Sequence, residues 1–135
     1  MKTLIVEDDF TSRLLLQTIL SPHGECHIAV NGQEAVDAFR SAAESARSYD
    51  LICMDIMMPL KNGLTALKEI RGREAFWNAT STVTMATPVR IIMTTAIGGN
   101  RNVEAAFDEL CDEYLVKPID RTKLLKLIKA LGLIQ

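Results

Sequence analysis

The chain has 135 residues, and its 15 Lys and Arg side chains against 17 Asp and Glu give a net charge of −2. Domains commonly hold about 150 residues, so we expect a single domain over residues 1–135. A hydrophobic fraction of 48% with 24% charged residues is ordinary for a globular protein and argues against disorder. The near balance of charge provides no overall field that would attract nucleic acid or an anionic membrane.

Neither membrane spanning nor export is expected. The longest unbroken apolar run covers residues 51–54, whereas a membrane-spanning helix needs about 20 apolar residues. The 3 cysteines are odd in number, widely spaced and set among apolar residues, which is typical of buried, reduced thiols. We therefore expect a cytoplasmic protein.

Short apolar runs recur along the chain, and each predicts a strand. They lie at residues 3–6, 26–30, 51–54, 89–93 and 114–116. Because these runs are continuous rather than alternating, they fit strands that are buried on both faces of a sheet.

The segments between these runs predict helices, because their apolar residues recur every three or four positions. Pro22 and Gly24 should end the first helix, whereas Asp120 should cap the last one and Gly132 should close it. A helix over 102–110 is less clearly marked. The positions expected to face the sheet are Leu15, Leu16, Ile19, Leu20, Ala35, Val36, Phe39, Ala43, Leu64, Leu67, Ile70, Leu124, Leu125, Ile128 and Leu131.

This alternation is (βα)₅ and predicts an α/β fold, a doubly wound five-stranded parallel sheet with helices on both faces. In such sheets the carboxyl ends of the strands share one edge, where ligands bind. The first strand ends in Glu-Asp-Asp at residues 7–9, the third in Asp55, the fourth in Thr94 and Thr95, and the fifth in Lys117. We expect these side chains to meet at that edge.

Such a cluster of acids predicts a cation site. Two unit charges about 4 Å apart repel by roughly 4 kcal/mol at an effective dielectric constant of 20. Oxygen ligands favour a hard cation, Mg²⁺ or Mn²⁺. Lys117 can reach one bound anion, and Thr95 supplies a hydroxyl donor. Acids, a divalent cation, a lysine and a hydroxyl together indicate phosphoryl transfer, with Asp55 as the nucleophile that forms an aspartyl phosphate.

The motifs at these strand ends resemble those of receiver domains of two-component response regulators, over essentially the whole chain. The matching segments are LIVEDD at 4–9, YDLICMDIMMP at 49–59 with Gly63, MTTA at 93–96 and YLVKP at 114–118. The resemblance implies a flavodoxin-like fold with strand order 2-1-3-4-5.

The resemblance also assigns the acids that follow the first strand. The family uses a pair of acids, with an arginine or a similar residue five positions after the second one. Arg13 stands five positions after Asp8, so Glu7 and Asp8 form the pair. Asp8 would then bind the metal directly, Glu7 would bind it through water, and Asp9 would help the first helix to start.

The remaining roles carry over from the same motifs. Asp55 resembles the phosphoacceptor and a metal ligand, and Met57 would give the metal its backbone carbonyl. Thr95 and Lys117 would bind phosphoryl oxygens, with a cis peptide bond after Lys117. Tyr114 matches the aromatic residue that moves with Thr95 in the switch. No other cofactor site is expected.

The resemblance implies a stand-alone receiver domain that takes phosphate from a histidine kinase or a histidine phosphotransfer protein. It would be a signalling domain with at most weak autophosphorylation and autodephosphorylation, not an enzyme. Its downstream protein partner would bind near the fourth helix, fifth strand and fifth helix. We expect a monomer or weak homodimer that contacts neither nucleic acid nor membrane.

Three alternatives come from other classes of protein. A phosphatase of the haloacid dehalogenase type needs a second acid two residues after the nucleophile, where Met57 stands. A flavodoxin-like electron carrier needs a phosphate-binding loop after the first strand, and the Glu-Asp-Asp there would repel phosphate. A receiver-like adaptor that works without phosphorylation remains open, although the set of acids, threonine and lysine is complete.

Two features depart from the family pattern. Met57 and Ile97 occupy the variable positions that flank the phosphoryl group, and neither can orient a water, so we expect slow self-dephosphorylation. The stretch 72–88, which holds Phe76, Trp77, Val83 and Met85, is longer than usual by roughly ten residues. It is either an extended third helix and loop that pack on the domain itself or a patch for a partner.

Overall fold

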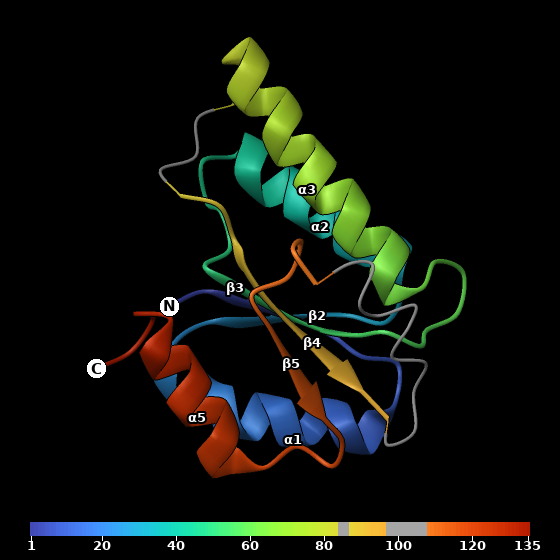
Figure 1. The fold of residues 1–135 in the computed structure, drawn as a ribbon, viewed down its shortest axis with the longest axis vertical. Helices are drawn as coiled ribbons and strands as arrows, with labels where there is room; N and C mark the ends of the chain where they lie inside the picture. The colour runs from blue at the N-terminus through green and yellow to red at the C-terminus, as the bar shows by residue number, and fades with distance from the viewer. Residues whose placement is uncertain (84–86, 97–107) are drawn as a thin grey trace.

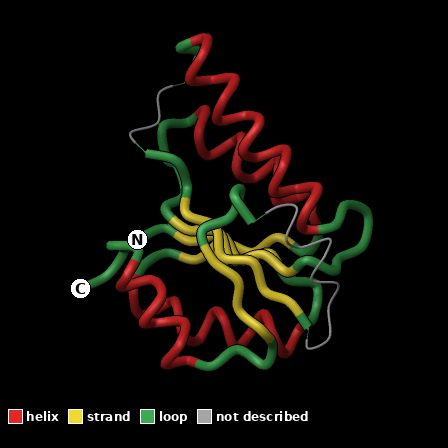
Figure 2. The backbone as a smooth tube through the Cα atoms, in the orientation of Figure 1, coloured by secondary structure: helices red, strands yellow, loops and turns green. Residues whose placement is uncertain are grey.

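The computed structural model describes residues 1–83, 87–96 and 108–135. Its sheet consists of β1 (Thr3–Val6), β2 (Cys26–Ala29), β3 (Leu51–Asp55), β4 (Arg90–Thr95) and β5 (Glu113–Val116). The strands are parallel in the order β2-β1-β3-β4-β5, as expected. Figure 2 shows the strands gathered in the middle of the molecule, with helices on either side. β4 runs two residues further than predicted because Thr94 and Thr95 pair with Leu115 and Val116.

The described helices are α1 (Phe10–Leu20), α2 (Gly32–Glu44), α3 (Gly63–Thr80) and α5 (Arg121–Ala130). α1 and α5 cover one face of the sheet, and α2 and α3 cover the other (Figure 1). Pro22 and Gly24 were expected to end the first helix. α1 ends at Leu20, and a 3₁₀ turn, Ser21–His23, follows it, because Pro22 cannot donate a backbone hydrogen bond. The helix expected over 102–110 falls mostly outside the described residues. Within the described ranges, no helix has the length and hydropathy needed to cross a bilayer.

Each of these four helices begins with the same capping device. The side chains of Asp9, Asn31, Asn62 and Asp120 accept a hydrogen bond from the backbone N–H three residues further on. An oxygen at this position satisfies one of the N–H groups that the helix itself leaves without a partner. The carboxylate of Asp9 is therefore used to start α1.

The hydrophobic core has two layers that the sheet separates. The layer beneath α2 and α3 contains Phe39, Leu67, Ile70 and Trp77 packed on Leu4, Ile52 and Ile91. The layer beneath α1 and α5 contains Leu16, Leu20, Leu124 and Ile128 packed on Ile5, Cys53 and Ile92. Leu15, expected to face the sheet, is 39% exposed instead.

The thiol of Cys53 is predicted to be inert in the folded protein. Burial raises its pKa to about 12, so at about pH 8 roughly one thiol in ten thousand is ionised. We expect iodoacetamide to alkylate the partly exposed Cys26 and Cys111 first and to reach Cys53 only in urea. Peptide mass spectrometry after timed quenching measures this order, and equal rates for Cys26 and Cys53 in native buffer would contradict it.

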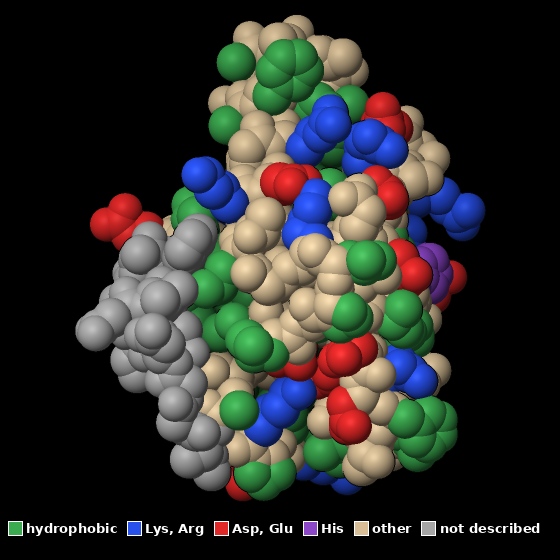
Figure 3. Space-filling model, turned by 90° about the vertical axis from the view of Figure 1, so that its right-hand side faces the viewer, with side chains coloured by type: hydrophobic (Ala, Val, Ile, Leu, Met, Phe, Trp, Pro, Cys, Tyr) green, Lys and Arg blue, Asp and Glu red, His purple; other side chains and the backbone are tan. Residues whose placement is uncertain are grey.

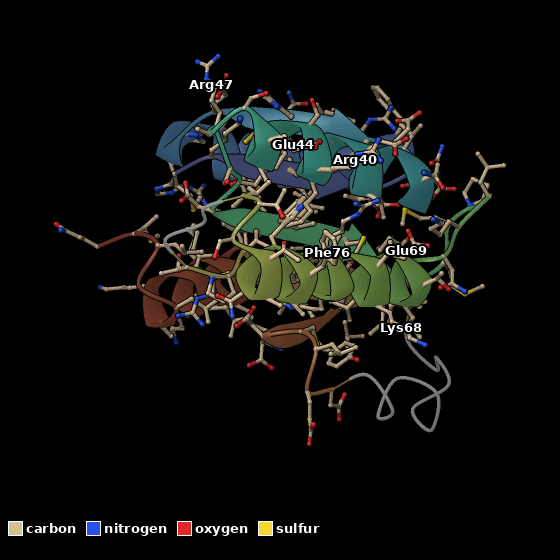
Figure 4. The ribbon with its side chains drawn as sticks, turned by 90° about the horizontal axis from the view of Figure 1, so that it is seen from above. Arg40, Glu44, Arg47, Lys68, Glu69 and Phe76 are labelled. Carbon is tan, nitrogen blue, oxygen red and sulfur yellow. The ribbon has the colours of Figure 1, made fainter. Side chains whose placement is uncertain are left out.

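The stretch that departs from the family pattern continues α3 and packs on α2. The Trp77 indole is 4% exposed and stacks on Phe39 with ring centroids 5.7 Å apart. Val83 packs against the same core. The neighbouring Phe76 is 56% exposed and lies on the side of α3 seen from above in Figure 4. The reading in which this stretch packs on the domain is confirmed for Trp77 and Val83, whereas Met85 lies outside the described residues.

Replacing Gly72 by alanine is expected to stabilise the protein by about 0.5–1 kcal/mol. Gly72 is an exposed residue in the interior of α3, and a Cβ atom there would meet no atom within 4 Å. The methyl group therefore restricts the unfolded chain without a clash in the folded one. Urea unfolding followed by circular dichroism measures the change. Gly63→Ala is the contrasting variant and should destabilise, because its Cβ would lie 2.1 Å from the Asp55 carbonyl oxygen.

Candidate phosphoacceptor site

Three carboxylates meet where β1 and β3 end. β1 and β3 are neighbours, with Val6 paired to Met54, so Glu7 follows one strand beside Asp55, the last residue of the other. Glu7 is fully buried, Asp55 is 6% exposed, and Asp8 is exposed. Carboxylate oxygens of Glu7, Asp8 and Asp55 all lie within 4.8 Å of one another. Figure 3 faces this edge of the molecule and shows acidic side chains gathered among hydrophobic ones.

The third acid after β1 points elsewhere. The Asp9 carboxylate accepts a hydrogen bond from the Ser12 N–H at 2.9 Å, and the hydrogen bonds from Ser12 lower the pKa of Asp9. The Asp9 N–H in turn donates to the Glu7 carboxylate at 3.2 Å. Arg13 donates to the backbone carbonyl of Glu7 at 3.3 Å. The geometry thus groups Glu7 and Asp8 with Asp55, and leaves Asp9 on the helix.

Lys117 is the counter-ion of this cluster. Its ammonium group pairs with the Glu7 carboxylate and lies 3.2 Å from the Asp55 Oδ2. Burial alone would lower the pKa of Lys117, but the hydrogen bond to Glu7 and the nearby Asp55 charge outweigh burial and raise it. Burial raises the pKa of Glu7, and the hydrogen bonds from Lys117 and Asp9 only partly offset this. The Lys117–Pro118 peptide bond is cis, as the resemblance implies.

Thr95 and Met57 contact this cluster through their backbone groups. Thr95 is buried at the end of β4, and its backbone carbonyl accepts a hydrogen bond from the Lys117 N–H at 2.7 Å. Met57 donates its backbone N–H to Asp55 Oδ1 at 3.3 Å, while its side chain is 74% exposed. Tyr114 lies on β5, where burial raises the pKa of its phenol. Ile97 is outside the described residues.

Two contributions to the site were not assigned from the sequence. Gly63 approaches the backbone of Asp55 so closely that no side chain fits there, and its N–H donates to the Ile56 carbonyl at 2.8 Å. A glycine directly after a helix-capping Asn62 is the signal that could have indicated this close approach. The second is the backbone N–H of Met57, which no side-chain pattern reveals.

The donor set fits a hard divalent cation. It consists only of carboxylate oxygens close enough to share one ion, which is the ligand type that Mg²⁺ prefers. Lys117 supplies one positive charge against the carboxylates, so further positive charge would be stabilising at this point.

Comparisons with known proteins show what the chain is similar to. The family model described as response regulator receiver domain matches residues 3–129. The chain is 33% identical over 129 residues to the chemotaxis protein CheY of Bacillus subtilis, covering 94% of this chain and 93% of that protein. It is also 34% identical to hybrid signal transduction histidine kinase G of Dictyostelium discoideum, of whose length it spans 4%.

Solved structures show the same fold. The receiver domain of Ssk1 from Saccharomyces cerevisiae, crystallised with the histidine phosphotransfer protein Ypd1, gives a TM-score of 0.81 at 32% identity, covering 98% of this chain and 88% of that one. The receiver domain of the sensor histidine kinase PA1611 from Pseudomonas aeruginosa PAO1, with magnesium in its active-site cleft, gives 0.71 at 28% identity, covering 96% and 94%. The chain therefore belongs to the response regulator receiver domain family of two-component signalling.

Proposed function

We propose that Asp55 accepts a phosphoryl group from a phosphohistidine on a histidine kinase or histidine phosphotransfer protein. The observation that carries this is the cluster of Glu7, Asp8 and Asp55 with Lys117 as counter-ion. Asp8, Asp55 and the Met57 carbonyl would hold Mg²⁺ or Mn²⁺ directly, and Glu7 would hold it through water. The metal, when bound, supplies charge neutralisation between the carboxylates and the phosphoryl oxygens.

The chain's own residues prepare Asp55 for this step. One carboxylate oxygen accepts the Met57 N–H and the other lies beside Lys117, so the orientation of the carboxylate is fixed. A carboxylate oxygen of Asp55 attacks phosphorus, and the bond from phosphorus to the donor histidine nitrogen breaks. The donor imidazole, which carries a proton on its other ring nitrogen, keeps the bonding electron pair and leaves as the neutral base. Lys117 and the Thr95 hydroxyl would then bind phosphoryl oxygens.

The phosphoryl group would act by a population shift. It favours the state in which Thr95 and Lys117 both reach it, and Tyr114 moves with Thr95. The downstream partner would bind the surface of β5 and α5 together with the segment between β4 and β5. Val116 on β5 is 52% exposed and belongs to that surface.

Exposed apolar side chains stand next to the cluster in the chain and favour docking of a protein donor. Phe10 follows the acids after β1 and is 66% exposed, and Met57 and Leu60 follow Asp55 with 74% and 88% exposed. Exposed apolar side chains commonly mark an interaction site where they form a contiguous patch. The complex of Ypd1 with the Ssk1 receiver domain supports a histidine phosphotransfer protein as donor.

We also propose that residues 1–135 form one receiver domain, that it is a monomer or weak homodimer, and that it works in the cytoplasm.

Incubation with Mg²⁺ and acetyl phosphate tests the proposal. Intact-mass spectrometry should show a gain of one phosphoryl group, and EDTA should prevent it. No gain with either acetyl phosphate or a cognate phosphohistidine donor would leave the phosphorylation-independent adaptor as the function.

Met57→Asn is expected to speed hydrolysis of the aspartyl phosphate on the order of 10-fold. The Met57 thioether cannot orient a water, whereas an amide can, and the side chain is exposed enough that its replacement leaves the core unchanged. Loss of the phosphoryl mass with time after removal of the donor measures the rate. Leu60→Asn, in the same loop and 88% exposed, is the matched control and should leave the rate unchanged.

A further inference from the structure

Arg71 joins three separate parts of the chain. It lies on α3, and its side chain is 18% exposed. Each of its three guanidinium nitrogens donates at least one hydrogen bond. The acceptors are the Leu110 carbonyl at 2.6 Å, the Val89 carbonyl at 2.8 Å, Glu74 at 2.7 Å and Asp112 at 3.2 Å. The planar guanidinium group of an arginine can reach acceptors in several directions at once, whereas the donors of a lysine all lie on one compact ammonium group.

These contacts hold the start of β4. The Val89 N–H donates a hydrogen bond to the second carboxylate oxygen of Glu74 at 2.8 Å, and the Val89 carbonyl accepts one from Arg71. Both backbone groups of the residue before β4 are therefore bonded to side chains of α3. Asp112 accepts from the Ile91 N–H at 2.7 Å and donates its own N–H to the Ile91 carbonyl at 2.8 Å. Side chains thus fix where β4 begins and where the chain enters β5.

The same pair of strands carries the proposed switch. Asp112 precedes Tyr114 by two residues on the way into β5, and Thr95 ends β4 at the other end of the ladder. The Lys117 N–H donates to the Thr95 carbonyl there. Arg71 therefore holds one end of a two-stranded ladder. Thr95 lies at the other end, and Lys117, which follows β5 there, has its ammonium group 3.2 Å from Asp55.

The phenol of Tyr114 lies against the segment that Arg71 holds. Burial raises the pKa of Tyr114, and the Cys111 thiol and the Asp108 carboxylate raise it further through charge and hydrogen bonding. Both of these residues belong to 108–112, the segment whose Leu110 carbonyl and Asp112 carboxylate accept from Arg71. Arg71 thus contacts Leu110 and Asp112 in the same short segment whose other residues contact Tyr114, and Leu110, Cys111 and Tyr114 pack on one core.

We propose that Arg71 is a positioning residue for signalling: it holds residues 108–112 against α3, and these residues hold Tyr114 in its resting position. The proposal rests on the proposed function in taking Tyr114 as the switch residue. It also gives the extended α3 a role, because Arg71 and Glu74 connect this helix to the strands of the switch.

Fluorine NMR of the protein labelled with 3-fluorotyrosine tests the position of Tyr114. The chain has 2 tyrosines, and Tyr49, which is hydrogen-bonded to His27 at 2.8 Å, serves as the internal reference. In Arg71→Met the Tyr114 signal should shift by more than its linewidth while the Tyr49 signal stays in place. In Arg71→Lys the Tyr114 signal should lie between its positions in wild type and in Arg71→Met. Arg40→Met removes a partly exposed arginine of α2 with ion pairs at 3.6 and 3.8 Å, and should leave both signals unchanged (Figure 4).

A second measurement separates positioning from simple stability. Because the contacts stabilise the resting state, Arg71→Met should bind beryllofluoride with Mg²⁺ about 3- to 10-fold more tightly than wild type. A merely structural arginine would lower the melting temperature without changing this affinity in the folded protein. An unchanged Tyr114 signal and an unchanged affinity in folded Arg71→Met would overturn the proposal. If that variant does not fold, Asp112→Asn decides by the same two measurements.

Failure of the proposed function would be recognised separately. It would appear as wild-type protein that binds no beryllofluoride and gains no phosphoryl group. The Tyr114 signals of unliganded wild type and Arg71→Met would still decide whether Arg71 positions Tyr114.

Discussion

Asp55→Asn is expected to abolish the Mg²⁺-dependent gain of a phosphoryl group from acetyl phosphate. The amide lacks the anionic oxygen that attacks phosphorus, and the cluster loses one of the charges that would hold the metal. In the folded protein one Asp55 oxygen lies 3.2 Å from the Lys117 ammonium group, and the other accepts the Met57 N–H. An asparagine fits this space, so the fold should persist while intact-mass spectrometry shows no adduct.

Asp9→Asn is the matched control for this experiment. Asparagine caps a helix as well as aspartate does, so α1 should begin at the same residue, and phosphorylation should proceed near the wild-type rate. Asp8→Asn should weaken Mg²⁺ binding instead. An adduct retained by Asp55→Asn would place the phosphoacceptor elsewhere. Loss of Mg²⁺ binding in Asp9→Asn but not in Glu7→Ala would show that the metal-binding pair of acids after β1 is Asp8 and Asp9 rather than Glu7 and Asp8.

The meeting of distant residues at this site could be predicted because parallel strands end at one edge of a sheet. Glu7, Asp55 and Lys117 each stand directly at or after the end of an apolar run, and the structure brings all three into contact. The positions at which the apolar runs end therefore indicated where the charged side chains meet. It did not reveal the fixed orientation of the Asp55 carboxylate, because that depends on the backbone N–H of Met57.

The network around Arg71 could not be predicted, and the reason is physical. Arg71 has the appearance of any polar residue on a helix, and its acceptors include two backbone carbonyls, which leave no trace in a sequence. Its carboxylate partner Asp112 lies 41 positions away, outside any periodic pattern. The extent of β4 was misjudged for a similar reason, since pairing with β5 rather than hydrophobicity carries it through Thr95.

Trp77→Ala is expected to destabilise the protein by about 3 kcal/mol, whereas Phe76→Ala should change stability by less than about 0.5 kcal/mol. The two aromatic residues are adjacent, and because successive residues project about 100° apart on an α-helix, Trp77 points into the core while Phe76 points to solvent. Trp77 stands seven residues after the buried Ile70, stacks on Phe39 and is 4% exposed, whereas Phe76 is 56% exposed. Removing the indole leaves a cavity between α2 and α3, and removing the Phe76 ring leaves none. Urea unfolding followed by far-ultraviolet circular dichroism measures both changes without relying on the tryptophan itself.

Trp77→Phe refines this comparison, because a smaller ring can still stack on Phe39 and should recover part of the stability lost in the alanine variant. Equal losses for Trp77→Ala and Phe76→Ala would mean that α3 is rotated from its described position. The same rotation would withdraw Arg71 and Glu74 from the start of β4, since all of these side chains extend from one rigid helix. The stability difference between adjacent aromatic residues therefore also tests the geometry on which the connection from α3 to Tyr114 depends.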